Sequence, residues 1–432
     1  MIAAAFQSRW PLSSRAARAA SGRGAVPGLD AVASSTAGAA AAPRLPELDG
    51  LRGLASLLVV TYHLWFVAGR PSFRVGPFDA AGPLSMGGTG VDLFFVLSGF
   101  LLVQPWLRAG GGRKPSVRGY FIRRLFRIVP LYYFSLLVLS VLRAPPPPTF
   151  PPATVTPGGV VAHLAFAPYL AMSPAINGVY WSLSTEMQFY LFLPLLAGMF
   201  ERGRWCLGFA ALVCLALAWR AIALVLLPGG GTEVQPVDVR SYFNMVMIAG
   251  RADAFGAGMA AAAVWVALNR ERRPMAGLLL SLIGAVVAAA APGSPLFAAS
   301  AGLDRLAYFF RPTLLSLGFA LLVLGAVLSA GRIRAVWRAP VLRLLGVMSF
   351  STYLWHLPIL TTVGAVLVSN GMMSLPTLVL AAVPPVLLAS AATYVCIEGP
   401  FMALGARLAT ALSDRPHGSP EHAQGALLGA GV

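Results

Sequence analysis

The chain has 432 residues, of which 57% are hydrophobic and only 11% are charged, and its mean hydropathy is +0.75. This composition excludes an ordinary soluble globular protein and is typical of a polytopic membrane protein. The net charge of +17 does not indicate a nucleic-acid partner, because the basic residues lie in short blocks between apolar segments rather than on one polar face.

Residues 1–43 precede the first apolar segment and contain four arginines and a single acid, Asp30. They lack the apolar core of about 7–15 residues that a secretory signal peptide needs. We therefore expect 1–43 to be a disordered basic cytoplasmic tail, although a transit peptide has a similar composition. Residues 44–405 are expected to form one transmembrane domain, and the polar residues 406–432 a second disordered cytoplasmic tail.

Ten apolar segments follow, each near the roughly 20 residues that a helix needs to cross a bilayer. They lie at about 50–68, 88–107, 128–143, 179–199, 206–227, 241–267, 276–291, 306–330, 344–368 and 376–398. The sequence therefore predicts an all-α polytopic membrane helix bundle of about ten transmembrane helices.

The connections between these segments alternate in charge. Those at 108–127, 200–205, 269–275 and 331–343 are rich in arginine, whereas 144–178 and 369–375 contain no Lys or Arg and 228–240 contains only Arg240. Because cytoplasmic loops of membrane proteins carry an excess of Lys and Arg, both termini are predicted to be cytoplasmic.

Arg52 and His63 lie eleven residues apart in the first apolar segment. At about 100° per residue they fall within about 20° of one another on the helix, and at about 1.5 Å per residue they differ by roughly 16 Å in depth. Arg52 is then a cation at the cytoplasmic surface, and His63 is an imidazole inside the bilayer toward its outer half. Ionisable side chains inside a membrane are costly and usually mark function.

Other segments carry polar side chains that can face the same interior. These are Asp92 and Ser98 in the second, Ser182, Glu186 and Tyr190 on one face of the fourth, Arg251 and Asp253 in the sixth, and Ser349, Tyr353 and His356 on one face of the ninth. We therefore predict one polar cavity that collects residues from several helices. The three cysteines show no metal-ligand spacing, so no metal site is expected.

His63 has the chemistry of a general base. A neutral imidazole can take a proton from an alcohol that attacks a thioester, while a carboxylate such as Asp92 or Glu186 fixes its tautomer and stabilises the cation that develops. The alternative is that His63 makes an inert hydrogen bond between helices.

Arg124 and Arg127 share one helical face at i, i+3 beside the third apolar segment. This spacing suits them to grip the phosphates of an anionic cytoplasmic cosubstrate. The alternative is an ordinary basic loop of the kind that orients membrane proteins.

Seven motifs occur in order between residues 44 and 405. They are residues 48–53 with His63, residues 90–100, Arg124-x-x-Arg127-x-x-Pro130-x-Tyr132, residues 181–186, Arg251-x-Asp253-Ala254, residues 349–356 and residues 397–401. Together they resemble the acyltransferase-3 family of integral membrane acyltransferases, which modify sugars of the cell envelope and, in some members, macrolide antibiotics.

Two positions depart from the family pattern. Glu186 lacks the second adjacent acid that many relatives have, and Glu398 is followed by Gly399-Pro400, where an arginine often precedes the proline. The first departure weakens a mechanism with paired carboxylates. The second is expected to affect only the inner surface, where Glu398 would be an anchor with Arg407.

The resemblance implies a ten-helix core, a cytoplasmic acyl-CoA donor and an acceptor that is reached from the outer side. Arg52 and His63 correspond to the essential pair of the family, Arg124 and Arg127 to its arginine motif, and Glu186 to its glutamate in the fourth span. We therefore expect a membrane O-acyltransferase that moves an acyl group, with acetyl as the expected group, from acyl-CoA to a hydroxyl of a carbohydrate-containing acceptor.

The location expected is a bacterial inner or plasma membrane, with acyl-CoA as cosubstrate and no bound cofactor or metal. The candidate catalytic residues are His63, Arg52, Glu186 and Asp92, and the candidate substrate-binding residues are Arg124, Arg127, Ser98, Tyr353, His356, Trp181 and Arg251. One alternative function is a proton-coupled transporter that uses the intramembrane His, Asp and Glu as a relay. Another is a catalytically silent membrane scaffold.

Overall fold

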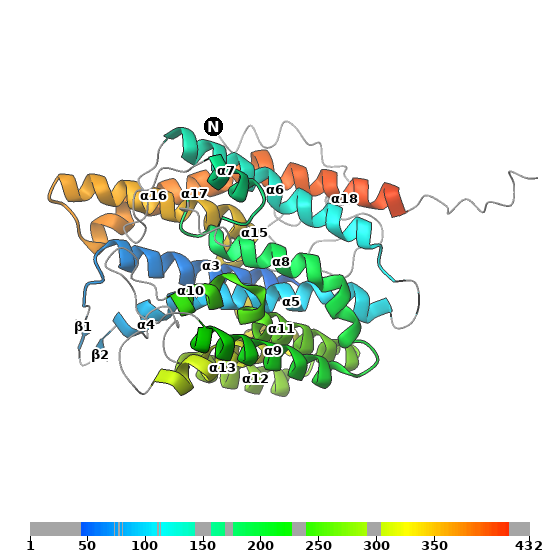
Figure 1. Cartoon of the computed structure of the whole chain (residues 1–432). Helices are drawn as coiled ribbons and strands as arrows, with labels where there is room; N and C mark the ends of the chain where they lie inside the picture. Colours follow the sequence, from blue (N-terminus) through cyan, green and yellow to red (C-terminus); the bar gives the residue numbers. More distant parts are fainter. Residues whose placement is uncertain are drawn as a thin grey trace, which may run out of the picture. The chain divides into compact units, whose positions relative to one another are not determined.

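The computed structural model describes residues 45–72, 74–76, 78–79, 81–109, 112, 114–142, 157–168, 176–226, 239–291 and 304–413. The predicted tail at 1–43 and residues 414–432 lie outside the described residues. Almost every described element is a helix (Figure 1). The exception is a ribbon of two short antiparallel strands in which Arg74 is paired with Asp79.

The elements follow one another in this order: α3 Pro46–Val67, β1 Arg74–Val75, β2 Phe78–Asp79, α4 Ala81–Ser85, η2 Met86–Thr89, α5 Gly90–Ala109, α6 Val117–Leu142, α7 Pro157–Leu164, α8 Tyr180–Leu196, η3 Ala197–Met199, α9 Trp205–Leu226, α10 Val239–Val246, α11 Ile248–Ala267, α12 Pro274–Ala290, α13 Asp304–Leu328, α14 Gly331–Trp337, α15 Pro340–Val347, α16 Ser349–Ser369, α17 Leu375–Thr393, η4 Tyr394–Glu398 and α18 Gly399–Ser413. The predicted all-α helix bundle is confirmed.

Each of the ten predicted apolar segments contains a helix. Within the described ranges, seven helical stretches are long and apolar enough to cross a bilayer, namely Pro46–Val67, Ala81–Ala109, Val117–Leu142, Trp205–Leu226, Phe309–Leu328, Ser349–Ser369 and Leu375–Leu412. α12 is a shorter apolar helix. The protein is therefore polytopic, while the count of ten spans and the side on which the termini lie stay predictions.

Several predicted boundaries are wrong. α6 begins at Val117, so Arg118, Arg123, Arg124 and Arg127 lie on a helix rather than in the predicted loop at 108–127. The predicted loop at 331–343 contains α14 and the first half of α15. α18 continues to Ser413, so residues 406–413 are helical rather than disordered. Arginine, alanine and leucine are strong helix formers, and charge alone does not separate a loop from the end of a helix.

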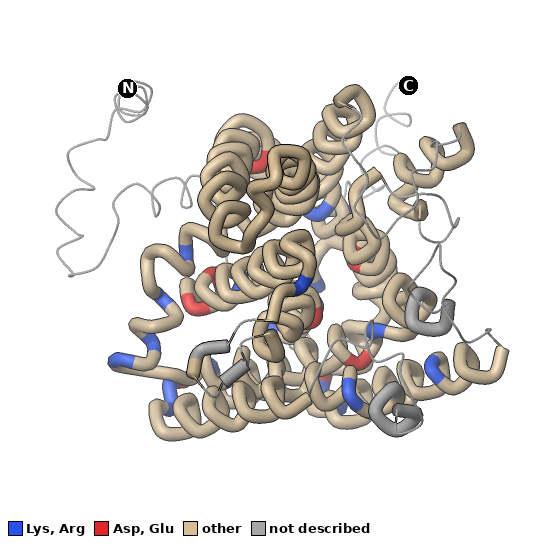
Figure 2. The backbone as a smooth tube through the Cα atoms, turned by 90° about the vertical axis from the view of Figure 1, so that its left-hand side faces the viewer, with Lys and Arg blue, Asp and Glu red and all other residues tan. Residues whose placement is uncertain are grey.

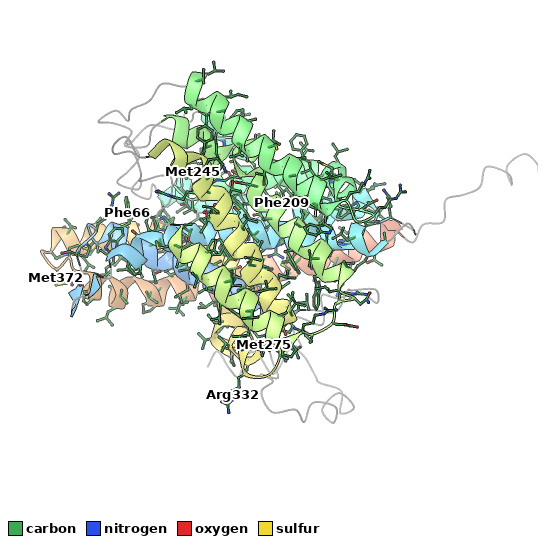
Figure 3. The ribbon with its side chains drawn as sticks, turned by 90° about the horizontal axis from the view of Figure 1, so that it is seen from below. Phe66, Phe209, Met245, Met275, Arg332 and Met372 are labelled. Carbon is green, nitrogen blue, oxygen red and sulfur yellow. The ribbon has the colours of Figure 1, made fainter. Side chains whose placement is uncertain are left out.

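The helices form layers. α6, α16, α17 and α18 pack together, α9, α11, α12 and α13 form an opposite group, and α3, α5 and α8 lie between them (Figure 1). Figure 2 shows charged residues within the bundle as well as at its edge. Arg332, at the start of α14, points away from the helices (Figure 3).

Glycines set the position of α3, which carries Arg52 and His63. A Cβ at Gly53 would lie 2.0 Å from the carbonyl oxygen of Leu342 in α15, and a Cβ at Gly346 would lie 1.7 Å from that of Asp49. The backbones of α3 and α15 are thus in direct contact, which small residues permit between membrane helices. This contact leaves little freedom to slide or tilt α3 at the level of Arg52.

Candidate active site

A cavity with an open mouth lies between α3, α5, α6, α8 and α16; its empty space, together with the solvent in the mouth, is about 740 Å³. Its polar lining comes from Arg52, Ser98, Arg124, Arg127, Ser182, Glu186, Tyr190, Ser349 and Tyr353. Apolar side chains such as Phe94, Phe95 and Leu101 complete the wall. The faces predicted on the fourth and ninth segments therefore meet, together with the arginines, around one space.

Three arginines give this cavity its electrostatic character. Arg52 donates from Nη2 to Ser349 Oγ at 3.0 Å, and the Nε atom of Arg124 is buried with no hydrogen-bond partner. Among the described residues, Arg52, Arg124 and Arg127 form no ion pair within 4.0 Å. Since partly buried guanidinium groups without an anionic partner are costly, this cluster is suited to bind an anion, in particular a phosphate.

Glu186 is held on the cavity wall by two hydroxyl groups. Ser98 donates to its Oε1 atom at 2.8 Å, and Tyr190, one turn further along α8, donates to the same atom at 2.6 Å. These bonds fix the carboxylate toward the cavity. The expected contact between His63 and Glu186 is wrong, because no hydrogen bond joins these two described residues.

His63 instead meets a second histidine. Its Nδ1 atom lies 2.9 Å from the carbonyl oxygen of Val59 and 3.2 Å from Nε2 of His356 in α16. The Nδ1 atom of His356 lies 3.0 Å from the carbonyl oxygen of Thr352. His356 is fully buried, whereas His63 is partly exposed.

The tautomers follow from these partners. A carbonyl oxygen only accepts hydrogen bonds, so Nδ1 of each ring carries the proton. The Nε2 atom of neutral His356 is then an acceptor for the Nδ1–H group of His63. The Nε2 atom of His63 is left with a free lone pair, which is the form that a general base or a nucleophile needs.

Tyr353 separates the histidine pair from the cavity. Its ring lines the cavity and lies 5.7 Å from the ring of His356, while neither His63 nor His356 is part of the cavity wall. Its hydroxyl donates to the carbonyl oxygen of Val179 at 3.0 Å and lies 2.6 Å from Ser182 Oγ. Tyr353 is therefore anchored between the arginine cavity and the histidines.

Asp92, Arg251 and Trp181 form a neighbouring group. Arg251 donates from Nη1 to Asp92 Oδ1 at 2.7 Å, and its guanidinium lies 5.8 Å from the centre of the Trp181 ring. The expected contact between Asp92 and His63 is wrong as well, because the carboxylate is already paired and buried.

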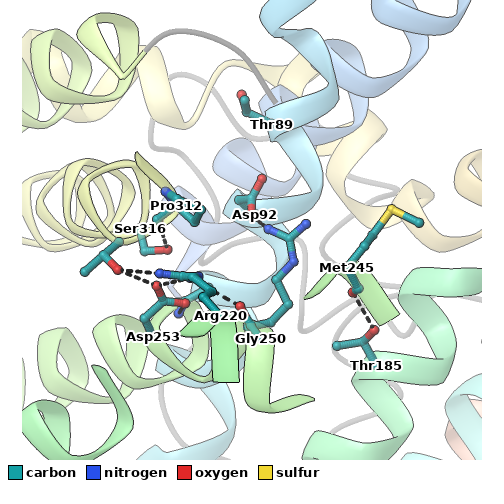
Figure 4. Close-up of polar contacts among 12 residues, drawn as sticks. Thr89, Asp92, Thr185, Arg220, Met245, Gly250, Asp253, Pro312 and Ser316 are labelled. Carbon is teal, nitrogen blue, oxygen red and sulfur yellow. Dashed lines mark hydrogen bonds and ion pairs between the residues drawn. The ribbon is translucent and has the colours of Figure 1, made fainter. Parts of the chain in front are cut away.

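Sequence reasoning missed Arg220 of α9, which is 1% exposed. It donates to Asp253 Oδ2 at 2.6 Å and to Thr313 Oγ1 at 3.0 Å, and so ties α9 to α11 and α13 (Figure 4). A single arginine inside the apolar segment 206–227 was the available signal, because an intramembrane charge needs a partner.

The fold and the cavity define a class of protein: a polytopic membrane helix bundle with an arginine-lined cavity, separated by one tyrosine from an intramembrane histidine pair. A model of the acyltransferase-3 family, described as an acyltransferase domain, matches residues 45–395. The chain belongs to this family.

Several proteins are similar to parts of the chain. The acyltransferase MdmB of Streptomyces mycarofaciens is 34% identical over 158 residues, which are 35% of this chain and 39% of MdmB. The peptidoglycan O-acetyltransferase OatA of Listeria monocytogenes is 31% identical over 168 residues, which are 35% of this chain and 24% of OatA. YrhL of Bacillus subtilis is 31% identical over 227 residues, which are 46% of this chain and 31% of YrhL.

The chain thus spans less than half the length of these relatives. No solved structure matches it.

Proposed function

We propose that the chain is a membrane O-acyltransferase that transfers an acyl group, with acetyl as the expected group, from acyl-CoA to a hydroxyl of a carbohydrate-containing acceptor. The observation that carries this proposal is the arrangement of three arginines without ion-pair partners around a cavity whose wall includes Tyr353, the side chain that packs against a histidine pair. Membership of the acyltransferase-3 family and the similarity to an acyltransferase and a peptidoglycan O-acetyltransferase support it.

The donor would bind with its phosphates at Arg52, Arg124 and Arg127. Guanidinium groups bind phosphate oxygens through paired, charge-assisted hydrogen bonds. The thioester end would extend along the apolar wall toward Tyr353, which lies next to His356. In this placement the arginines are at the cytoplasmic end of the bundle, and the acceptor reaches His63 from the outer side.

His63 would then act through its free Nε2 atom. As the acceptor oxygen attacks the thioester carbonyl carbon, Nε2 takes the hydroxyl proton, the new C–O bond forms and the C–S bond breaks. The proton then passes to the departing thiolate. His356 accepts a hydrogen bond from the Nδ1–H group of His63, and so it would orient the ring and stabilise the imidazolium in place of the carboxylate expected from sequence.

The same nitrogen is placed to act as a nucleophile that carries the acyl group between donor and acceptor. Direct transfer and this two-step relay use the same residues. They differ in whether an acylated His63 accumulates when the donor is supplied without an acceptor.

The test uses membranes that contain the full chain, acyl-CoA with a labelled acetyl group, and candidate envelope sugars as acceptors. We expect label in the acceptor and release of free CoA, and we expect both to fall in Arg124→Ala. Arg332→Ala is the matched control, because Arg332 is exposed and points away from the bundle. Movement of a solute without consumption of CoA would instead favour the proton-coupled transporter.

A further inference from the structure

Glu398 is the last residue of η4, which continues α17, and it is buried, with 2% of its surface exposed. The expectation that it is a surface anchor is therefore wrong. Residues Tyr394–Glu398 form a π-helical turn, closed by a hydrogen bond from the Gly399 N–H to the carbonyl oxygen of Tyr394. Such a turn holds an extra residue and so changes the direction in which the following side chains point.

Within the described part of the chain, the carboxylate is held by one direct partner. Ser351 of α16 donates from Oγ to Glu398 Oε2 at 2.6 Å. Ser351 lies two residues after Ser349, the residue that accepts the hydrogen bond from Arg52. The same first turn of α16 therefore contacts a cavity arginine and the Glu398 carboxylate.

η4, which ends at Glu398, packs against α6, the helix that carries Arg127, so the carboxylate is near enough to Arg127 and Arg52 to attract them electrostatically. Among the described residues, however, it forms no ion pair within 4.0 Å. The bond from Ser351 thus holds the carboxylate near the guanidinium groups but short of contact. The arginines can therefore still bind another anion, but the negative charge of Glu398 weakens their attraction for it.

We propose that Glu398, restrained by Ser351, is a counter-charge that weakens the binding of CoA and its acyl thioester and thereby speeds release of the CoA product. This inference rests on the proposed function. Glu398 touches no reacting atom, so it is a positioning residue that acts through Arg127 and Arg52. The carboxylate also offsets part of the charge of Arg127 and Arg52 while no donor is bound, which reduces the cost of placing these cations close together.

Two substitutions are expected to change CoA affinity in opposite directions. Glu398→Gln removes the charge but keeps an oxygen for Ser351, and should bind CoA about fivefold more tightly than wild type. Ser351→Ala frees the carboxylate to pair with Arg127, and should bind CoA more weakly. In the double variant the freed group has no charge, so tight binding should return.

The experiment measures equilibrium binding of CoA to the purified full chain in lipid nanodiscs, with the thermal midpoint of each variant as a check of folding. Glu271→Gln is the matched control, because it removes an exposed carboxylate that is paired with Arg273; its CoA affinity should not change. In turnover, Glu398→Gln should lower KM for the acyl donor and also lower kcat, because release of CoA becomes slower.

A purely structural role for Glu398 makes the opposite prediction. Unchanged or weaker CoA binding in a folded Glu398→Gln protein would overturn the inference, while the donor proposal would stand. If Glu398→Gln does not fold, the CoA affinity of Ser351→Ala is the deciding measurement. Unchanged or tighter CoA binding in Ser351→Ala would then overturn the inference. Absence of CoA binding to the wild type would overturn the proposed donor and this inference together.

Discussion

The Nδ1 atom of His63 lies 3.2 Å from the Nε2 atom of His356, so the intramembrane histidine of α3 has a histidine of α16 as its partner. Arg52, on the same helix as His63, is bonded to Ser349, on the same helix as His356. α3 and α16 thus meet at two levels, one at the arginine cavity and one at the histidine pair. Changes to α16 should therefore affect catalysis even where they touch no substrate.

His356→Asn tests the role of the pair. The Nδ1–H group of His63 then keeps the carbonyl oxygen of Val59 but loses the Nε2 acceptor of His356, so its ring is less well oriented and its imidazolium less well stabilised. We expect kcat to fall by about tenfold to a hundredfold, with a small change in KM for the donor. Thr361→Ala on the same helix is the control, since Thr361 donates only to carbonyl groups of its own helix. Equal kcat in His356→Asn and Thr361→Ala would contradict the role of His356.

Arg127→Lys tests whether Arg127 binds the phosphates of acyl-CoA. Lysine keeps the charge but loses the planar pair of donors, so KM for acyl-CoA should rise by about tenfold while kcat changes little. Initial rates over a range of donor concentrations separate the two constants. A fall in kcat at unchanged KM would show that Arg127 acts in the chemical step instead.

Asp92 is expected to contribute to stability rather than to proton transfer. Asp92→Asn leaves the buried guanidinium of Arg251 without its counter-charge, which should cost about 3–5 kcal/mol of unfolding free energy. The thermal midpoint of the purified protein measures this loss. Activity per folded molecule should stay near that of wild type; a stable but inactive Asp92→Asn protein would restore Asp92 to the catalytic group.

Gly53→Ala tests the contact that positions Arg52. The new methyl group would lie 2.0 Å from the carbonyl oxygen of Leu342, so α15 must move, which should cost about 1–3 kcal/mol of stability. Gly82→Ala is the control, because a Cβ there meets nothing within 4 Å. Similar thermal midpoints for the two variants would show that α3 and α15 are less tightly joined than the glycine contact indicates.

Periodicity predicted which residues share a helix face. Ser182, Glu186 and Tyr190 on α8 do line one cavity, because spacing within a regular helix fixes direction. The partners of those faces were not predictable in the same way. His63 meets His356 rather than a carboxylate because glycine contacts between helices decide which faces approach, and these depend on segments far apart in sequence.

Local departures from the regular helix were also beyond the pattern. Glu398 is buried because a π-helical turn changes the direction of its side chain. A hydrophobic pattern with the regular period of 3.6 residues cannot predict such a turn. Charge pattern also misplaced the start of α6. Arg124 and Arg127 were predicted to share a helical face, but the segment 108–127 was predicted to be a loop; α6 begins seven residues before Arg124, so both arginines lie inside a helix.

The most direct test of the proposed mechanism is acetyl transfer by His63→Asn. The asparagine amide can still donate to the carbonyl oxygen of Val59, but it has no nitrogen at the position of Nε2. With CoA binding and thermal midpoint unchanged, we expect transfer of labelled acetyl from acetyl-CoA to fall by about a thousandfold or more. Transfer at the wild-type rate in a folded His63→Asn protein that binds CoA would contradict the central role of His63.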